Sequence, residues 1–214
     1  MTDDTRHGTP RKGLSQERIC AAALGVIDEE GLPALNMRRL GAALQVGAMA
    51  LYRHLPNKQA ILEGVVDLVL ADLAGDSSGE VRDRAYCFFK SLRDVLAAHP
   101  NAIPLVANFA LQTGSAKQRA TRLLDAMQES GLNEEQALDA FHTLESFTLG
   151  YAWLEVAGFV GELPEDTPFM RRNVRRAAVA SASAGRAAPT LSDTARDDRF
   201  ARCLRAVLAA LLPA

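Results

Sequence analysis

The side chains best suited to bind another molecule lie in one short segment near the N-terminus. Tyr52, Arg53, His54 and Lys58 fall within seven residues, and Arg38 lies shortly before them. All five carry N–H or O–H donors, so they are suited to contact phosphate oxygens. The sequence contains no His-Glu-x-x-His, no Cys-x-x-Cys and no glycine-rich phosphate loop. The segment therefore predicts binding, and nothing argues for catalysis.

Two short helices joined by a tight turn are predicted to position these side chains. The first covers about residues 36–44, the turn 45–47, and the second residues 48 to about 55. Apolar residues recur at helical spacing in both, so each helix buries one face. A longer helix over about 15–31 precedes them, with a serine cap at its start and a glycine at its end. We expect a three-helix unit in which the second short helix lies on the outer surface.

This arrangement is typical of a helix-turn-helix, in which the second helix lies in the major groove of DNA. Ala48, Met49 and Ala50 offer no side-chain hydrogen bonds, so contacts with thymine methyl groups and DNA shape would carry more of the specificity. Tyr52 has a structural alternative, which is to pack on the first helix. The predicted DNA-binding residues are Arg38, Ala48, Met49, Ala50, Tyr52, Arg53, His54 and Lys58.

The second short helix and the residues after it carry a family resemblance. The segment Leu51 to Lys58, followed by Ile61 and Leu62, closely resembles the tetracycline-repressor (TetR) family, and Leu40 and Val46 fit the same head. The resemblance implies a homodimer, double-stranded operator DNA with two half-sites, and release of DNA on ligand binding. The apolar residues of the C-terminal part predict that this ligand is a small hydrophobic effector. We expect a repressor; the alternative is an activator, because the sign of regulation depends on the position of the operator, which lies outside this chain.

One position in the turn departs from the family pattern. Gln45 stands where the family often has glycine, so a residue with a side chain has to make the turn. We expect the neighbouring Gly47 to relieve it. Gly41, where the family often has alanine, would allow a close helix crossing.

The whole chain is predicted to be all-α, with a helix-turn-helix head and a C-terminal helical bundle. We expect a disordered arm over residues 1–14, the DNA-binding head over 15–62 with a connecting helix at 58–74, and a ligand-binding and dimerisation domain over 79–214. The boundary is placed at 75–79, Gly-Asp-Ser-Ser-Gly, a flexible joint. The head and its flanks, residues 1–58, hold eight Lys and Arg against six Asp and Glu, while the rest holds 16 against 20.

The C-terminal part is predicted to supply the dimer interface. Helical patterns cover residues 81–99, 115–130, a long helix from 133 to 160, and 194–212, while Pro104 interrupts the apolar stretch 101–112. The long helix contains Phe-Thr-Leu-Gly at 147–150, which resembles the pocket-and-dimer helix of the tetracycline-binding branch. We expect the apolar faces 147–160 and 200–211 to pair across a two-fold axis in a four-helix bundle. The predicted interface residues are Gly150, Phe200, Leu204, Leu208 and Leu211.

A mostly apolar pocket for a drug-sized molecule is predicted among the helices between residues 81 and 160. The break at Pro104 would open it. The aromatic residues have a structural alternative as ordinary core, and His142 as an ordinary helix residue. The predicted ligand-binding residues are Phe88, Leu105, Phe109, Gln112, Phe141, His142 and Trp153.

The amino-acid composition narrows the classes of protein to which this chain could belong. The chain has 214 residues, 48% of them hydrophobic and 23% charged, the mix of a soluble globular protein. Its three cysteines are far apart and suggest neither disulfides nor zinc, and we expect no metal and no cofactor. No apolar stretch reaches membrane-spanning length, and we expect a cytoplasmic protein. The alternatives are an enzyme with a dispersed site and a helical adaptor that binds protein rather than DNA.

Overall fold

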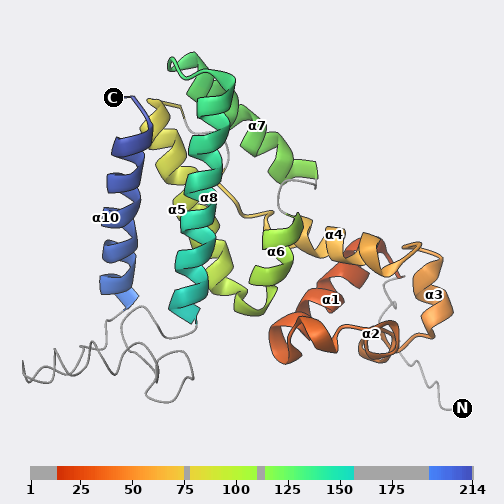
Figure 1. Ribbon diagram of the computed structural model, residues 1–214. Coiled ribbons are helices and arrows are strands. Elements are labelled where there is room, and N and C mark those ends of the chain that lie inside the picture. Colours follow the sequence, from red (N-terminus) through yellow and green to blue (C-terminus); the bar gives the residue numbers. More distant parts are fainter. Residues whose placement is uncertain (1–13, 75–77, 110–113, 157–192, 214) are drawn as a thin grey trace, which may run out of the picture. The chain divides into compact units, whose positions relative to one another are not determined.

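The computed structural model describes residues 14–74, 78–109, 114–156 and 193–213. Every regular element in these ranges is a helix, as the all-α prediction requires (Figure 1). The chain divides into two units, Met1–Val65 and Val66–Ala214, here called the head and the body. Nearly all of the predicted arm at 1–14 lies outside the described residues. No helix in the described ranges is long and apolar enough to cross a membrane.

The head is a set of short helices around one small core. It contains α1 (Gln16–Glu30), the 3-10 turn η1 (Leu32–Ala34), α2 (Met37–Leu44), α3 (Ala48–Tyr52) and the start of α4 (Lys58–Val69). Side-chain caps begin α1, α2 and α4, because Ser15, Asn36 and Asn57 accept hydrogen bonds from backbone N–H groups three residues on. Ile19, Ile27, Leu40, Leu51 and Ile61 are almost fully buried in the core. These local signals fix where each helix begins and which face turns inward.

The turn between α2 and α3 is made by Gln45 and not by Gly47. Gln45 is left-handed, with φ 57° and ψ 40°, and within the described ranges it is the only non-glycine residue with positive φ. Gly47 has an extended backbone, with φ −71°. The expectation that Gly47 relieves the turn was wrong, because the left-handed bend has to occur directly at the C-cap of α2. Gln45 therefore carries the conformational cost that the family glycine avoids.

The body is a helical bundle built around α5. It contains α5 (Val81–Ala98), the 3-10 turn η2 (Pro100–Ala102), α6 (Ile103–Phe109), α7 (Gly114–Glu129), α8 (Glu134–Val156) and α10 (Asp193–Leu211). α5 packs against α7, α8 and α10, and Figure 1 shows α5, α8 and α10 running side by side. Phe88 and Phe89 of α5 meet Phe141 of α8 with ring centroids 5.9 and 5.5 Å away. The core of the body is therefore aromatic at its centre.

Pro104 lies in the first turn of α6 and does not break a helix. The predicted interruption in the middle of 101–112 was wrong, because a 3-10 turn at residues 100–102 comes first and α6 begins at Ile103. In the first turn of a helix the missing N–H of proline leaves no hydrogen bond unmade. Pro104 therefore gives no reason for an open cavity.

The joint at residues 75–79 has the spacing Gly-x-Ser-x-Gly of a nucleophile motif. That motif requires a strand directly before the turn. The described residues before it belong to α4 and a short turn, so the spacing alone does not indicate a nucleophile.

Candidate nucleic-acid interface and ligand site

The helix-turn-helix is held tightly enough to fix the direction of α3. The backbone N–H of Val46 donates to the carbonyl of Gly41 at 2.9 Å. A Cβ at Gly41 would lie 2.7 Å from the carbonyl oxygen of Val46, so glycine allows this close approach. Leu51, fully buried, anchors α3 to the core of the head. The outer face of α3 is therefore presented as a rigid surface.

The outer face carries the residues that the sequence singles out. Met49 is 76% exposed and Tyr52 45%, so Tyr52 does not pack into the core. Ala48 and Ala50 are half-buried on either side of Met49. The surface that a DNA groove would meet is thus small and apolar.

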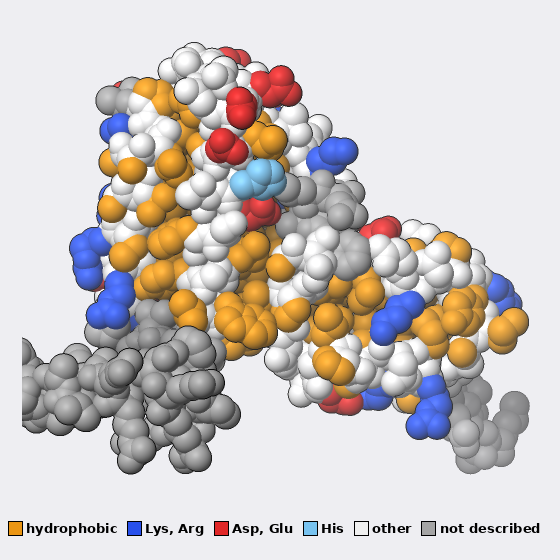
Figure 2. Space-filling model, viewed as in Figure 1, with side chains coloured by type: hydrophobic (Ala, Val, Ile, Leu, Met, Phe, Trp, Pro, Cys, Tyr) orange, Lys and Arg blue, Asp and Glu red, His pale blue; other side chains and the backbone are white. Residues whose placement is uncertain are grey.

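Three exposed cations lie on the helix-turn-helix and at the start of the next helix. Arg38, Arg53 and Lys58 are exposed, and no ion pair involves them within the described ranges, whereas the guanidinium of Arg39 binds the Glu30 carboxylate. That hydrogen bond lowers the pKa of Glu30 and raises the pKa of Arg39. Figure 2 shows Lys and Arg side chains in blue on the surface of the head. The three cations remain available for phosphates.

The backbone around His54 is fixed by α1. Gln16 Nε2 donates to the carbonyl of His54 at 2.8 Å, and Asn57 Oδ1 accepts from the N–H of Ala60 at 2.8 Å. His54 itself is half-buried. These bonds hold the chain between α3 and α4, and with it the positions of Arg53 and Lys58.

The predicted ligand residues fall into three groups. Phe88 and Phe141 line a small cavity in the body, about 20 Å³ in volume. Leu105 is buried but does not line it. Gln112 and the side chain of Phe109 lie outside the described residues. The cavity is lined by Leu70, Leu73, Phe88, Phe89, Leu92, Ala116, Phe141 and Glu145.

Trp153 and His142 do not belong to the cavity wall. Trp153 is 52% exposed, so its predicted place in an enclosed pocket was wrong. It lies twelve residues after Phe141, which turns it roughly 120° around α8 from the buried stripe. The His142 ring is 51% exposed, and its Nδ1 lies 3.3 Å from Glu145 Oε2. The polar residue of the cavity wall is Glu145, which belongs to the same predicted pocket region but is not among the predicted ligand-binding residues; it lies four residues after Phe141, on the same helix face.

The predicted dimer residues of α10 face the core of their own chain. Phe200, Leu204 and Leu208 are at most 2% exposed. Phe200 stacks on Phe147 at 5.7 Å and meets Tyr151 at 5.0 Å. Their assignment to a dimer interface was therefore wrong, because α5 and α8 already cover this stripe.

A different face of α8 and α10 is exposed. Gly150 is exposed, and a Cβ there would meet nothing within 4 Å. Leu211 is half-buried. Figure 2 shows hydrophobic side chains along this side of the body. This side also carries the exposed polar residues His142 and Arg199; its exposed small or apolar residues are Leu138, Ser146, Gly150, Trp153, Leu154, Cys203, Ala206 and Ala210.

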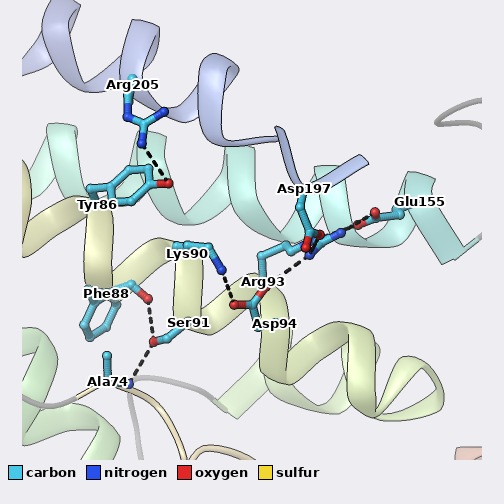
Figure 3. Close-up of polar contacts among 10 residues, drawn as sticks. All are labelled: Ala74, Tyr86, Phe88, Lys90, Ser91, Arg93, Asp94, Glu155, Asp197 and Arg205. Carbon is cyan, nitrogen blue, oxygen red and sulfur yellow. Dashed lines mark hydrogen bonds and ion pairs between the residues drawn. The ribbon is translucent and has the colours of Figure 1, made fainter. Parts of the chain in front are cut away.

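A partly buried ion cluster ties three helices of the body together; its Asp197 side chain is 51% exposed (Figure 3). Arg93 of α5 donates from Nε to Glu155 Oε2 of α8 at 2.9 Å, and its Nη1 binds Asp197 of α10. The side chains of Arg93 and Glu155 are only 9% and 8% exposed. Burial acts to lower the pKa of Arg93, but its hydrogen bonds to Glu155, Asp94 and Asp197 outweigh it and raise the pKa. Arg93 therefore stays charged near neutral pH.

Two family models match the chain. The model "Bacterial regulatory proteins, tetR family" matches residues 19–65, and "Tetracyclin repressor-like, C-terminal domain" matches residues 75–213. A curated relative, an HTH-type transcriptional regulator of Saccharopolyspora erythraea, is 30% identical over 139 residues. That match covers 64% of this chain and 59% of the relative, so the chain spans less than two thirds of the relative's length.

Solved structures match nearly the whole chain. ActR of Streptomyces coelicolor in complex with (S)-DNPA has a TM-score of 0.66 at 25% identity, over 92% of this chain and 98% of its own. BioQ with its natural double-stranded DNA operator has a TM-score of 0.61 at 27% identity, over 80% and 99%. The head and the body are therefore both similar to parts of known regulators, one bound to a small molecule and one to DNA.

Proposed function

Since the chain belongs to the tetracycline-repressor family of bacterial regulatory proteins, we propose that it is a sequence-specific DNA-binding transcriptional repressor. The observation that carries the proposal is the exposed face of α3, on which Met49 is 76% exposed, together with three exposed cations, Arg38 in α2, Arg53 at the end of α3 and Lys58 at the start of α4. Met49 and its alanine neighbours contact base edges, and the cations contact phosphates. Tyr52 and His54 add donors at the end of α3. The protein acts in the cytoplasm, where the operator DNA is found.

Lys58 tests the phosphate contacts. Changing Lys58 to Ala should weaken binding to all DNA sequences and reduce the slope of log K against log salt by about one unit for each subunit on the DNA. The measurement is fluorescence anisotropy on genomic DNA fragments over a salt series. Lys117→Ala, which removes the same charge from the exposed surface of α7, is the matched control and should leave the slope unchanged. An unaltered slope in the Lys58 variant would mean that Lys58 faces away from DNA.

We propose further that two copies pair through the exposed face of α8 and α10. A symmetric operator with half-sites about 34–36 Å apart requires two heads on one side of the duplex. Small residues such as Gly150 and Ala206 let helices approach closely, and Trp153 and Leu154 supply apolar area. The solvent-exposed apolar side chains then become the centre of a four-helix interface.

Gly150 tests the dimer. Gly150→Arg should leave the helices of each chain intact, because nothing lies within 4 Å of the added Cβ, and should abolish close pairing through α8. Sedimentation at micromolar concentration should show a dimer for the parent chain and a monomer for the variant, while circular dichroism shows equal helix content. Ala97→Arg, on the exposed side of α5, should remain dimeric. A dimeric Gly150 variant would place the interface elsewhere, and a monomeric parent would exclude a dimer.

We propose that a small hydrophobic ligand enters the cavity of the body and releases the DNA. The cavity of about 20 Å³ has room for about one water molecule, so a larger occupant has to separate its walls. Leu70 and Leu73, which follow α4 directly, form one wall. The same short segment is held by Arg119, which donates to the carbonyls of Leu70 at 2.7 Å and Ala71 at 3.2 Å.

These contacts make α4 the element that carries the ligand's effect. α4 begins at Lys58 in the head, and the chain after it is anchored in the body by Arg119 and by Ser91, whose Oγ accepts from the N–H of Ala74 at 2.8 Å (Figure 3). A ligand that prefers the displaced arrangement has to lower DNA affinity by the same factor, typically with ~1–3 kcal/mol of coupling. A compound that raises the melting temperature yet leaves DNA affinity unchanged would refute the coupling.

A further inference from the structure

One residue in the wall of the cavity in the body is polar. Seven of its eight lining residues are apolar, and the eighth is Glu145 of α8. Phe88, Phe89 and Phe141 form the aromatic side of the same space. A carboxylate at the edge of an aromatic cavity is costly to desolvate unless a donor accompanies it.

The contacts of Glu145 leave it available for such a donor. Its side chain is 16% exposed, and within the described residues its partner is His142, with Nδ1 3.3 Å from Oε2. The His142 ring is 51% exposed, so water competes for this contact. No lysine or arginine of the described ranges forms an ion pair with Glu145.

We propose that the ligand of the body is a hydrophobic molecule with a protonated amine, and that Glu145 is the residue that recognises it. The inference rests on the proposed function only in taking this cavity as the effector site. A ligand in the cavity strips water from the Glu145 carboxylate. An alcohol or hydrocarbon of the same shape leaves the charge with a weak partner, whereas an ammonium group forms a charge-assisted hydrogen bond with it. The half-exposed ring of His142 contacts Glu145, but the place of the carboxylate in the wall is set by α8.

The experiment compares two probes of equal shape, naphthylmethylamine, which is protonated at neutral pH, and naphthylmethanol, which is uncharged. Their affinities for the full chain are measured by isothermal titration calorimetry. The amine should bind at least about tenfold more tightly than the alcohol, which corresponds to about 1.4 kcal/mol. Glu145→Gln should remove this preference by weakening the amine alone. Glu129→Gln, which neutralises an exposed carboxylate on α7, should keep the preference and excludes a general effect of net charge.

His142→Ala separates recognition from positioning. If Glu145 recognises the amine, the His142 variant keeps the preference, because the carboxylate remains in the wall. Equal binding of the two probes, failure of the amine to bind at millimolar concentration, or a preference that survives Glu145→Gln would each overturn the proposal.

DNA release is measured separately, on operator fragments selected from genomic DNA. A Glu145-dependent preference for the amine without DNA release would support the inference and contradict the proposed coupling. Release by the alcohol and the amine alike, unaltered in the Glu145→Gln variant, would support the coupling and overturn the inference.

Discussion

Replacing Arg93 with methionine should lower the free energy of unfolding of the body by about 3–5 kcal/mol. The substitution keeps most of the side-chain volume but removes the charge that faces Glu155, whose side chain is only 8% exposed. The carboxylate is then left buried without its cation, which costs far more than the ion pair itself contributes. Asp197 of α10 loses the same partner, so α8 and α10 both loosen from α5. Urea unfolding followed by circular dichroism measures the change.

Lys90 offers a matched control on the same helix. Its ammonium group pairs with Asp94 four residues on, at 2.6 Å, and both side chains are about two-fifths exposed (Figure 3). Lys90→Met should therefore cost only about 0.3–0.5 kcal/mol. The double variant Arg93→Met with Glu155→Leu should recover much of the lost stability, because it removes the orphaned carboxylate. If the Arg93 and Lys90 variants lose equal free energies of unfolding, the ion cluster is solvated and contributes no more than a surface ion pair.

Replacing Met49 with glutamate should weaken DNA binding by at least about 100-fold without destabilising the protein. A carboxylate at the centre of α3 would lie against the phosphates and base-edge acceptors of the groove, and like charges brought together at an interface cost several kcal/mol. Met49 is 76% exposed, so the head gains nothing from burying it and the melting temperature should not fall. Binding to genomic fragments at low salt and thermal unfolding are measured on the same preparation.

Two further variants serve as controls for Met49→Glu: a conservative change at the same position and the same charge placed at a distant position. Met49→Ala should alter the preference among operators more than the overall affinity, because it removes apolar contact and adds no repulsion. Ala97→Glu, which adds the same charge on the exposed side of α5, should leave DNA binding within about twofold of the parent at moderate salt. If Met49→Glu binds DNA as the parent does, α3 is not the surface that meets the groove.

Much of the head could be predicted from the sequence because its signals are local. The spacing of Leu40, Leu51 and Ile61 determines which faces turn inward, and Ser15 and Asn36 mark where helices begin. The turn was predicted in the right place and with Gln45 making it, but the expectation that Gly47 would relieve it was wrong. Which of two neighbouring residues takes the left-handed backbone depends on the geometry of the C-cap, and the composition of the turn does not reveal it.

In the body, the sequence determined that long amphipathic helices exist, and only the tertiary structure decided what each face meets. The spacing of Phe200, Leu204 and Leu208 predicts a buried face. The same spacing would appear whether that face packs against the same chain or against a second copy. Here the same chain covers it. Likewise Arg93 lies 62 residues from Glu155 and 104 from Asp197. These pairs form only when the helices pack, and the same holds for the place of Glu145 in the aromatic cavity. The spacing of residues along the chain does not show which distant side chains will lie together in a buried region.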